Sequence, residues 1–274
     1  MNLRVGEGTR LDPFHVDDLQ TPIFEPLWPI LSRFSRRTAW PNTGDFNALA
    51  SEWNLPSDFG LSFSDVMDDE LGYERRIAER GEIQCRPNSW HDFFNAMTAI
   101  TFPRTKRAVN RRQMTSRDKE RETSQSGRSP ELNMLAHFEE CGVIVLSASE
   151  ELTDHLRSFR WQQLFWERRQ QVENHMRFII YGHGLYAKAR TPYIGLTGHA
   201  VILQCHPRDI DAPLDWIDEC TESLIDCREA YRCPRDLAPI PLLGIPGWDE
   251  ANSNAAFYSN TTYFRPGRRS KVLP

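Results

Sequence analysis

The residues best suited to chemistry lie in the segment Asn88–Lys106, which reads NSWHDFFNAMTAITFPRTK. His91, Asn95 and Thr98 recur at the helical spacing i, i+4 and i+7, so they form a polar stripe on one predicted helix. Asp92 follows His91 directly. A histidine beside a carboxylate can serve near neutral pH as a general base or as a metal ligand. We therefore take His91, Asp92 and Asn95 as catalytic candidates.

The same stripe also has a structural interpretation, which the sequence leaves open. The rest of the helix surface is apolar, being made of Trp90, Phe93, Phe94, Met97 and Ile100. A short helix of this kind is expected to be buried on most sides. Its polar groups then need partners, because an unpaired buried polar group costs about 1–3 kcal/mol. In this interpretation His91 and Asn95 only tie the helix to a neighbouring element.

A second group of candidates is Gly182-His183-Gly184, followed along the chain by His199. His183 is expected where a strand ends and a helix begins, a position at which active-site groups gather. The flanking glycines allow the backbone to bend sharply or to approach a ligand closely. His183 is therefore a fourth catalytic candidate, and the predicted divalent-metal ligands are His91, Asp92, His183 and His199. Because no dense His-x-x-x-His spacing is present, separate structural roles for these histidines are the alternative.

Basic residues follow the histidine helix. Pro103 suits the first turn of a new helix, whose N-terminus favours anions. Arg104 and Lys106 begin a series of cations that continues to Arg121, on a chain whose net charge is −5. We predict that Arg104 and Lys106 bind an anionic group of the substrate. The alternative is a solvated basic face that only balances nearby acids.

The first half of the chain predicts the elements that carry the histidine helix. That helix is expected from Asn88 or Ser89 to Ile100, and a second helix from Pro103 to Arg112. Candidate strands are Leu61–Val66 and Tyr73–Ile83, the second of which also fits an exposed hairpin arm. The Ser-, Thr- and charge-rich stretch from Thr115 to Pro130 predicts a flexible loop.

The second half alternates between helices and short apolar strands. The expected series is a helix at 129–140, a strand at 143–146, a helix at 149–174 with a break near Ser158, a strand at 176–181, a helix at 185–190, a strand at 199–203 and a helix at 213–226. Such alternation indicates a small buried sheet covered by helices. The predicted fold class is α+β, mostly helical, with an irregular arm over residues 1–22 and a single domain around a small mixed sheet over residues 23–274.

Composition limits the classes of protein to which the chain can belong. Hydrophobic residues make up 39% and charged residues 26% of 274 residues, as in an ordinary globule. No apolar run of about eighteen residues predicts a membrane span, and the N-terminus does not resemble a signal peptide. The six cysteines contain no Cys-x-x-Cys pair, so we expect plain thiols. We accordingly expect a cytoplasmic location without a membrane partner.

Four segments of the chain are distinctive: YERRIAERG, NSWHDFFNAMTAITFPRTKRAVN, GHGLYAKARTPYIGLTGHA, and LLGIPGW followed by YFRP. In these segments most strongly, and over most of its length from about Trp28 to Pro266, the chain resembles the bacterial domain of unknown function 3025 family. The second of these segments is the most specific. The family has no established catalytic residues, so the resemblance assigns no activity, cofactor or site residue.

Two departures from the family pattern bear on mechanism. Relatives often have a histidine three residues after Asn110, where this chain has Gln113. That difference weakens the comparison with a histidine–asparagine–histidine nuclease site. The stretch expected to read L-T-x-F-D-E is here LAHFEE, residues 135–140, which retains the acidic pair.

These observations support three hypotheses of different classes. The leading one is a metal-assisted hydrolase, with a divalent metal as cofactor, that acts on an anionic, phosphate-bearing small molecule. The second is a non-catalytic binding or scaffold protein in which the His/Asp/Asn motif is structural. The third is nucleic-acid binding through the segment Arg104–Arg121, which the negative net charge of the whole chain disfavours.

Overall fold

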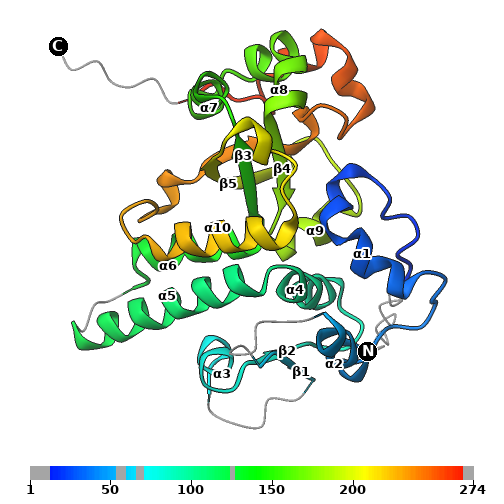
Figure 1. Cartoon of the computed structure of the whole chain (residues 1–274), viewed down its shortest axis with the longest axis vertical. Helices are drawn as coiled ribbons and strands as arrows, with labels where there is room; N and C mark the ends of the chain where they lie inside the picture. Colours follow the sequence, from blue (N-terminus) through cyan, green and yellow to red (C-terminus); the bar gives the residue numbers. More distant parts are fainter. Residues whose placement is uncertain (1–12, 54–59, 66–70, 124–126, 268–274) are drawn as a thin grey trace, which may run out of the picture.

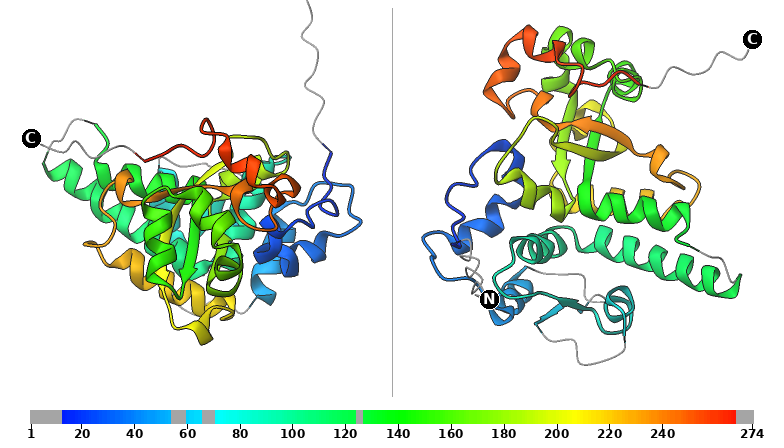
Figure 2. Two further views of the ribbon diagram at one scale, coloured as in Figure 1. Left: turned by 90° about the horizontal axis from the view of Figure 1, so that it is seen from above. Right: turned by 180° about the vertical axis from the view of Figure 1, so that it is seen from behind.

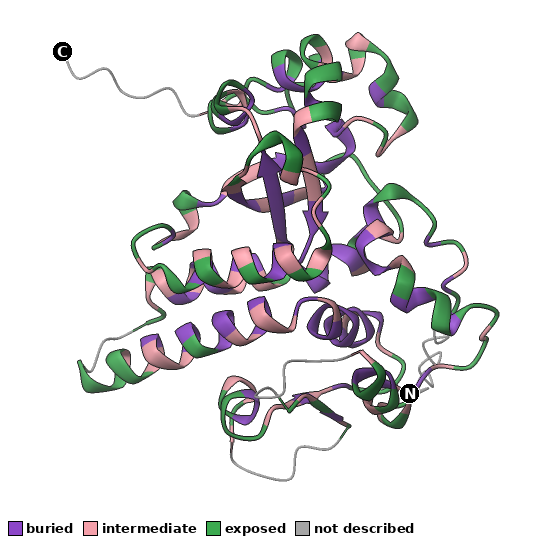
Figure 3. Ribbon diagram, viewed as in Figure 1, coloured by how far each residue is buried: buried purple, intermediate pink, exposed green. Residues whose placement is uncertain are grey.

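A four-stranded mixed sheet lies at the centre of the computed structural model, which describes residues 13–53, 60–65, 71–123 and 127–267. The strand order is β4-β3-β5-β6, with β3 antiparallel to β4, parallel to β5, and β5 antiparallel to β6. β3 is buried along its whole length (Figure 3). The strands are β3 (Gly142–Ser147), β4 (Met176–Ile180), β5 (Thr197–Gln204) and β6 (Ala238–Pro241). The α+β class, mostly helical around a small mixed sheet, is confirmed.

Helices cover both faces of this sheet (Figure 1). Because successive strand residues point to opposite faces, Ile144 and Leu146 of β3 pack in one apolar cluster, while Val143 and Val145 pack in another. The helices of the Ile144 face are α5 (Pro103–Glu122), α6 (Pro130–Cys141) and α10 (Leu214–Asp226). Those of the Val143 face are α4 (Trp90–Thr101), α7 (Glu150–Arg157), the π-helical turn Gln163–Glu167, α8 (Arg169–His175) and α9 (His183–Ala189).

The helix–strand alternation predicted for the second half is confirmed in order and type. α6 is capped by the Ser129 side chain, and α7 ends with Ser158 at its C-cap, where a break was expected. Strand β6 was not predicted, because its sequence APIP contains two prolines, which read as irregular structure. Among the described strands β6 pairs with β5 alone and lies at the edge of the sheet, where a missing N–H is tolerated.

The prediction of a strand over residues 73–83 is wrong for most of its length. Tyr73–Arg80 forms helix α3, and only Glu82–Gln84 forms a strand, β2. The helical period places Arg76 and Ile77 on the buried side, and Gly81 ends the helix with a positive φ of 65°. β2 pairs in parallel with β1 (Ser62–Ser64), within the other predicted strand, whose last residue, Val66, is outside the described residues.

The predicted loop at 115–130 is also replaced in large part by helix. α5 continues to Glu122 and projects beyond the body of the molecule (Figures 1 and 2). Its polar side chains have partners on neighbouring helices that the sequence alone does not reveal. Ser116 donates to Glu131 of α6, and Arg117 pairs with Glu74 of α3 at 2.5 Å. Residues 124–126 of the predicted loop lie outside the described residues.

The first described residues pack against the histidine helix. Phe14 is buried, and its ring stacks on Trp90 with centroids 5.2 Å apart. Residues 1–12 of the predicted arm lie outside the described ranges. Short helical elements follow: a 3-10 turn at Pro22–Leu27, α1 (Trp28–Leu31), a 3-10 turn at Ser32–Phe34 and α2 (Thr43–Glu52). None of the helices in the described ranges is both long and apolar enough to cross a lipid bilayer.

Candidate functional site

His91 lies in the first turn of α4 and is held there by its neighbours. Ser89 caps the helix by accepting a hydrogen bond from the Asp92 amide at 3.3 Å. Asp92 is buried, and its Oδ1 lies 3.0 Å from Nδ1 of His91. Arg86 donates to both carboxylate oxygens of Asp92, at 2.7 and 2.9 Å. Asp92 therefore fixes the orientation of the His91 ring and leaves its Nε2 directed away.

Three side chains from three helices converge at this point. Nε2 of His91 lies 3.4 Å from Oε2 of Glu140, at the end of α6, and Nε2 of His183 lies 3.4 Å from Oε1 of the same carboxylate. The two imidazole rings meet edge to face, with centroids 4.5 Å apart. One ligand atom from each residue lies within 4.8 Å of the other two. We call His91, Glu140 and His183 the triad.

The two glycines around His183 make room for the end of α6. A Cβ at Gly184 would lie 2.4 Å from Oε2 of Glu140, and a Cβ at Gly182 would lie 2.4 Å from the backbone N of Gly142. A larger residue at 184 would displace the Glu140 carboxylate, and one at 182 would displace the backbone where α6 meets β3. The glycines around His183 predict a sharp bend or a close approach to a ligand, and the close approach that they allow is to another part of the chain.

Two members of the triad, Glu140 and His183, have the ionisation state that a metal ion requires, and His91 must first lose a proton. The hydrogen bonds that His91 donates to the carboxylates of Asp92 and Glu140 raise the pKa of His91 to about 9, against the effect of its burial. Hydrogen bonds from His183 and His91 hold the pKa of Glu140 well below its ordinary value. Burial lowers the pKa of His183. At neutral pH the site thus holds a carboxylate and a neutral imidazole beside a protonated imidazole, whose proton a metal ion would replace.

In this arrangement Asp92 is a hydrogen-bond partner of the ligand candidate His91, and it is not itself part of the triad. Burial opposes ionisation of Asp92, but the hydrogen bonds from Arg86 and His91 outweigh that effect and hold its pKa below the ordinary value. A carboxylate on the second ring nitrogen of a metal-binding histidine fixes its tautomer and orientation. Two histidines and one glutamate form a ligand set found in catalytic zinc sites, so the residues present fit such an ion.

Asn95 lies one helical turn beyond His91 in the same cavity but bonds to a different group. Its Oδ1 accepts from Nζ of Lys106 at 2.9 Å, and its Nδ2 donates to the Tyr73 hydroxyl at 2.7 Å. Lys106 in turn donates to Glu139 at 2.5 Å and is 2% exposed. Burial opposes the charge of Lys106, yet the carboxylate of Glu139 keeps the lysine pKa above its usual range. Lys106, expected to bind a substrate anion, is therefore neutralised inside the protein.

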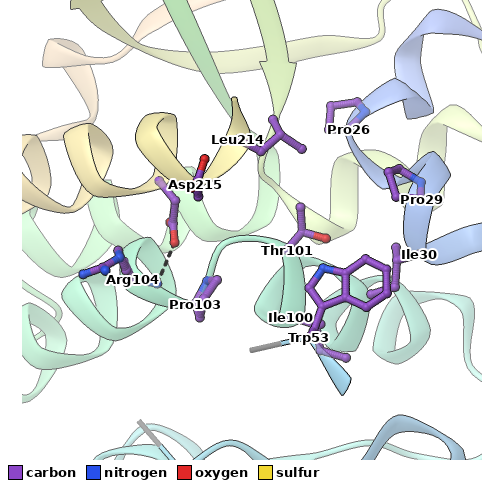
Figure 4. Close-up of a pocket in the computed structure, with 11 residues that line it drawn as sticks. Pro26, Pro29, Ile30, Trp53, Ile100, Thr101, Pro103, Arg104, Leu214 and Asp215 are labelled. Carbon is purple, nitrogen blue, oxygen red and sulfur yellow. Dashed lines mark hydrogen bonds between the residues drawn. The ribbon is translucent and has the colours of Figure 1, made fainter. Parts of the chain in front are cut away.

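Arg104, the other residue expected to bind an anion, lies at a different cavity. That cavity has a volume of about 460 Å³ and includes Trp53, Leu214 and Asp215 in its wall (Figure 4). The amides of Arg104 and Thr105 at the start of α5 both donate to the Asp218 carboxylate, at 2.9 Å each. The helix N-terminus predicted to attract a ligand anion thus binds a carboxylate of α10.

His199 does not join the triad. Its ring lies 5.0 Å from that of His137 on α6, and it lines a third cavity, of about 430 Å³, with Trp161 and Tyr263. The alternation along β5 explains this placement, because His199 points to the face that α6 covers. His183 belongs to α9, on the opposite face of the sheet. The two histidines are close in sequence order but are separated by the sheet.

The cavity at the triad has a volume of about 390 Å³. Beside the triad and Asp92, its wall contains residues that the sequence interpretation did not select as site residues: Tyr73, Glu74, Gln84, Arg86, Gln113, Arg128, Ala136 and Glu139. The signal for Glu139 and Glu140 was present, since the acidic pair in LAHFEE immediately precedes the glycine that begins β3. Only the fold shows that Glu140 faces the histidines.

Comparison with known proteins identifies relatives of the chain without identifying a reaction. The sequence model of one family, described as "Protein of unknown function (DUF3025)", matches residues 61–268. That range contains the triad and every residue in the wall of its cavity. No curated protein matches the chain, and no solved structure does.

Proposed function

We propose that this protein, which belongs to the DUF3025 family, is a metal-assisted hydrolase whose metal ion is bound by His91, Glu140 and His183. The observation that supports this proposal is the convergence of one nitrogen or oxygen atom from each of these residues within 4.8 Å. The site opens into a cavity of about 390 Å³, large enough for a small substrate. Three protein ligands leave further coordination positions for water and substrate.

A bound zinc ion would supply a hydroxide nucleophile at neutral pH and would polarise the group that is attacked. The protein residues hold the metal ligands in position. Asp92 holds His91 by its Nδ1, and Gly184 leaves the space in which the Glu140 carboxylate lies. Arg86 donates to both oxygens of Asp92, so its role is to orient Asp92 and not to bind the substrate.

Arg128 replaces Arg104 and Lys106 as the proposed anion-binding residue. It is exposed in the wall of the triad cavity. Within the described residues its side chain has no carboxylate partner within ion-pair distance. A single exposed arginine suits a substrate with one anionic group, such as a phosphomonoester or a carboxylate.

The basic helix gives the nucleic-acid alternative no support. Arg104, Arg107 and Arg111 of α5 all face Glu222 of α10, at 3.4–3.8 Å. Arg111 also pairs with Asp226 at 2.5 Å. These cations therefore join two helices of the same protein, and the segment offers less free positive charge than its sequence implies.

The proposal is tested by metal content and affinity before any substrate is known. The purified chain is dialysed against zinc and washed, and its bound metal is measured by mass spectrometry. The affinity for zinc is measured separately by calorimetric titration of the metal-free chain. We expect about one zinc per chain, and a loss of binding of about 100-fold or more in His183→Ala and Glu140→Gln. His206→Ala, an exposed histidine outside the cavity, is the matched control.

Activity is then assayed on p-nitrophenyl phosphate and p-nitrophenyl acetate with the zinc-loaded protein. Hydrolysis that His183→Ala abolishes and His206→Ala retains supports the proposal. A wild-type chain that binds no zinc, manganese or iron above the level of the His183→Ala variant contradicts it. The structural interpretation of the motif would then be favoured, and it predicts a large loss of thermal stability in His91→Ala.

A further inference from the structure

Beside the triad, the same cavity has a second set of polar side chains that the proposed metal chemistry does not use. It consists of Tyr73, Asn95, Lys106, Glu139 and Gln113, and we call it the polar floor. Tyr73, Asn95, Glu139 and Gln113 are part of the cavity wall, while Lys106 is buried behind them. Because lysine can only donate and a carboxylate can only accept, the direction of each hydrogen bond in the polar floor is determined.

The hydroxyl of Tyr73 accepts hydrogen bonds from its neighbours, and its own proton has no acceptor among the described residues. Lys106 donates to Oδ1 of Asn95, so the Asn95 amide nitrogen is the atom that faces Tyr73, and it donates to the tyrosine oxygen at 2.7 Å. The Lys106 ammonium, 3.5 Å from the same oxygen, is also a donor. The Tyr73 oxygen therefore accepts, and among the described residues its own O–H has no acceptor.

Gln113 presents the opposite chemistry. Its Nε2 donates to Oε2 of Glu139 at 2.9 Å, which fixes the amide orientation and leaves Oε1 as a free acceptor. Over the described part of the chain, no donor bonds to this Oε1. The polar floor therefore offers a ligand one donor, from Tyr73, and one acceptor, from Gln113, in a single cavity.

From this pairing we infer that the polar floor binds a carboxamide group of the substrate, an inference that rests on the cavity of the proposed function and specifies its substrate class. The Tyr73 hydroxyl donates to the amide carbonyl oxygen, and Oε1 of Gln113 accepts the amide N–H. A carboxylate in this place would set an acceptor oxygen against Oε1 of Gln113 and supply it with no donor. A ketone or an ester satisfies Tyr73 alone and leaves Gln113 without a donor, which forfeits about one neutral hydrogen bond.

The geometry of the polar floor makes it specific as well as complementary. Glu139 and Lys106 are paired to each other, so neither charge is available to a ligand. Asn95 and Gln113 are 4% and 2% exposed, and each is held by a bond to that pair. The two free groups are thus fixed before a ligand arrives, and little conformational entropy is lost when it binds.

The test compares benzamide with acetophenone, which differ in having an NH2 or a CH3 group beside the same carbonyl. Binding of each probe to the full chain is measured by saturation-transfer NMR titration. We expect benzamide to bind wild type about fivefold more tightly, as for one neutral hydrogen bond. In Gln113→Leu this preference is expected to disappear, and in Tyr73→Phe both probes are expected to bind about fivefold more weakly with the preference retained.

Controls separate recognition from folding and from the metal. Tyr193→Phe, an exposed tyrosine outside the cavity, should leave both affinities unchanged. Thermal unfolding of each variant shows whether a change in affinity is only a loss of folded protein. Equal affinity of wild type for the two probes, or a preference that persists in Gln113→Leu, overturns the inference. Zinc binding is measured on the same samples, so a failure of the proposed metal site appears independently of the amide result.

Discussion

The carboxylate of Glu140 occupies the space that a side chain at Gly184 would fill, since a Cβ there would lie 2.4 Å from Oε2. Gly184 directly follows His183 of the triad. The space for the Glu140 carboxylate is therefore provided by the residue next to His183. The absence of a side chain at position 184 is therefore a requirement of the site itself, and it does not arise from a positive φ.

Gly184→Ala is expected to weaken zinc binding without unfolding the protein. The added methyl group displaces the Glu140 carboxylate, and displacement of a ligand should cost about 10–100-fold in metal affinity, as for loss of a supporting residue. Calorimetric titration with zinc measures the effect. Gly72→Ala is the matched control, because a Cβ at that glycine meets no atom within 4 Å. Equal zinc affinities for the two variants would contradict the role assigned to Gly184.

Asp92→Asn is expected to retain the fold and to reduce metal affinity by about 10–100-fold. The change removes the charge that fixes the His91 ring through Nδ1, while an amide oxygen can still accept from Arg86. The Asp92→Asn variant should retain all three ligands, but the His91 ring should be less firmly oriented. If zinc affinity and the NMR signals of the His91 ring stay those of wild type, Asp92 has no orienting role.

Lys106→Met is expected to lower the free energy of unfolding by about 3–5 kcal/mol, because it leaves the Glu139 carboxylate buried without its partner. The double variant Lys106→Met/Glu139→Gln should recover most of this loss. Urea denaturation measures both. Arg33→Met is the control, since the exposed pair of Arg33 with Glu52 should contribute no more than about 1 kcal/mol. A double variant no more stable than the single one would argue against an unpaired charge as the cause.

His199, which lies outside the triad, is expected to make the folding stability of the protein sensitive to acid. Burial, the proximity of His137 and the charge of Lys188 lower the pKa of His199 from 6.5 to about 4. A histidine whose pKa is lower in the folded state stabilises the fold above pH 6.5, and this stability is lost as the pH falls towards 4. Between pH 7 and 5 the loss is about 1–2 kcal/mol for a partly solvated group.

His199→Gln should therefore gain stability relative to wild type as the pH is lowered from 7 to 5. The comparison is made by urea denaturation at each pH, so that other titrating groups cancel between the two proteins. His15→Gln, whose side chain is 49% exposed, serves as the control. A constant difference between wild type and His199→Gln over this pH range would show that His199 has the same pKa in the folded and unfolded chains.

Much of the fold follows from local sequence patterns. The apolar runs that became β3 and β4 and the capped helix α6 were predictable because each is determined by residues adjacent in the chain. Helices α3 and the second half of α5 were not, because their charged residues resemble loop or exposed strand until their partners are known. Those partners, such as Glu131 for Ser116 and Glu74 for Arg117, lie fifteen and forty-three residues away.

The candidate site was predictable in part for the same reason. His91 and His183 were selected from their local motifs, and the structure places their rings together. The inclusion of Glu140 depended on the angle at which α6 meets α9, which no local pattern contains. Likewise, Arg104 and Lys106 appeared free because the carboxylates that neutralise them, Glu222 and Glu139, come from distant segments.

The direct junction of α6 with β3 gives the site little tolerance for changes in chain length. Glu140 and Gly142, the first residue of the central strand, are separated only by Cys141. An inserted or deleted residue near the end of α6 cannot be absorbed by a loop, and it would turn the Glu140 side chain by about 100° around the helix axis. Homologous chains that retain this site are thus expected to vary in length elsewhere, while the spacing between the glutamate and the strand stays constant.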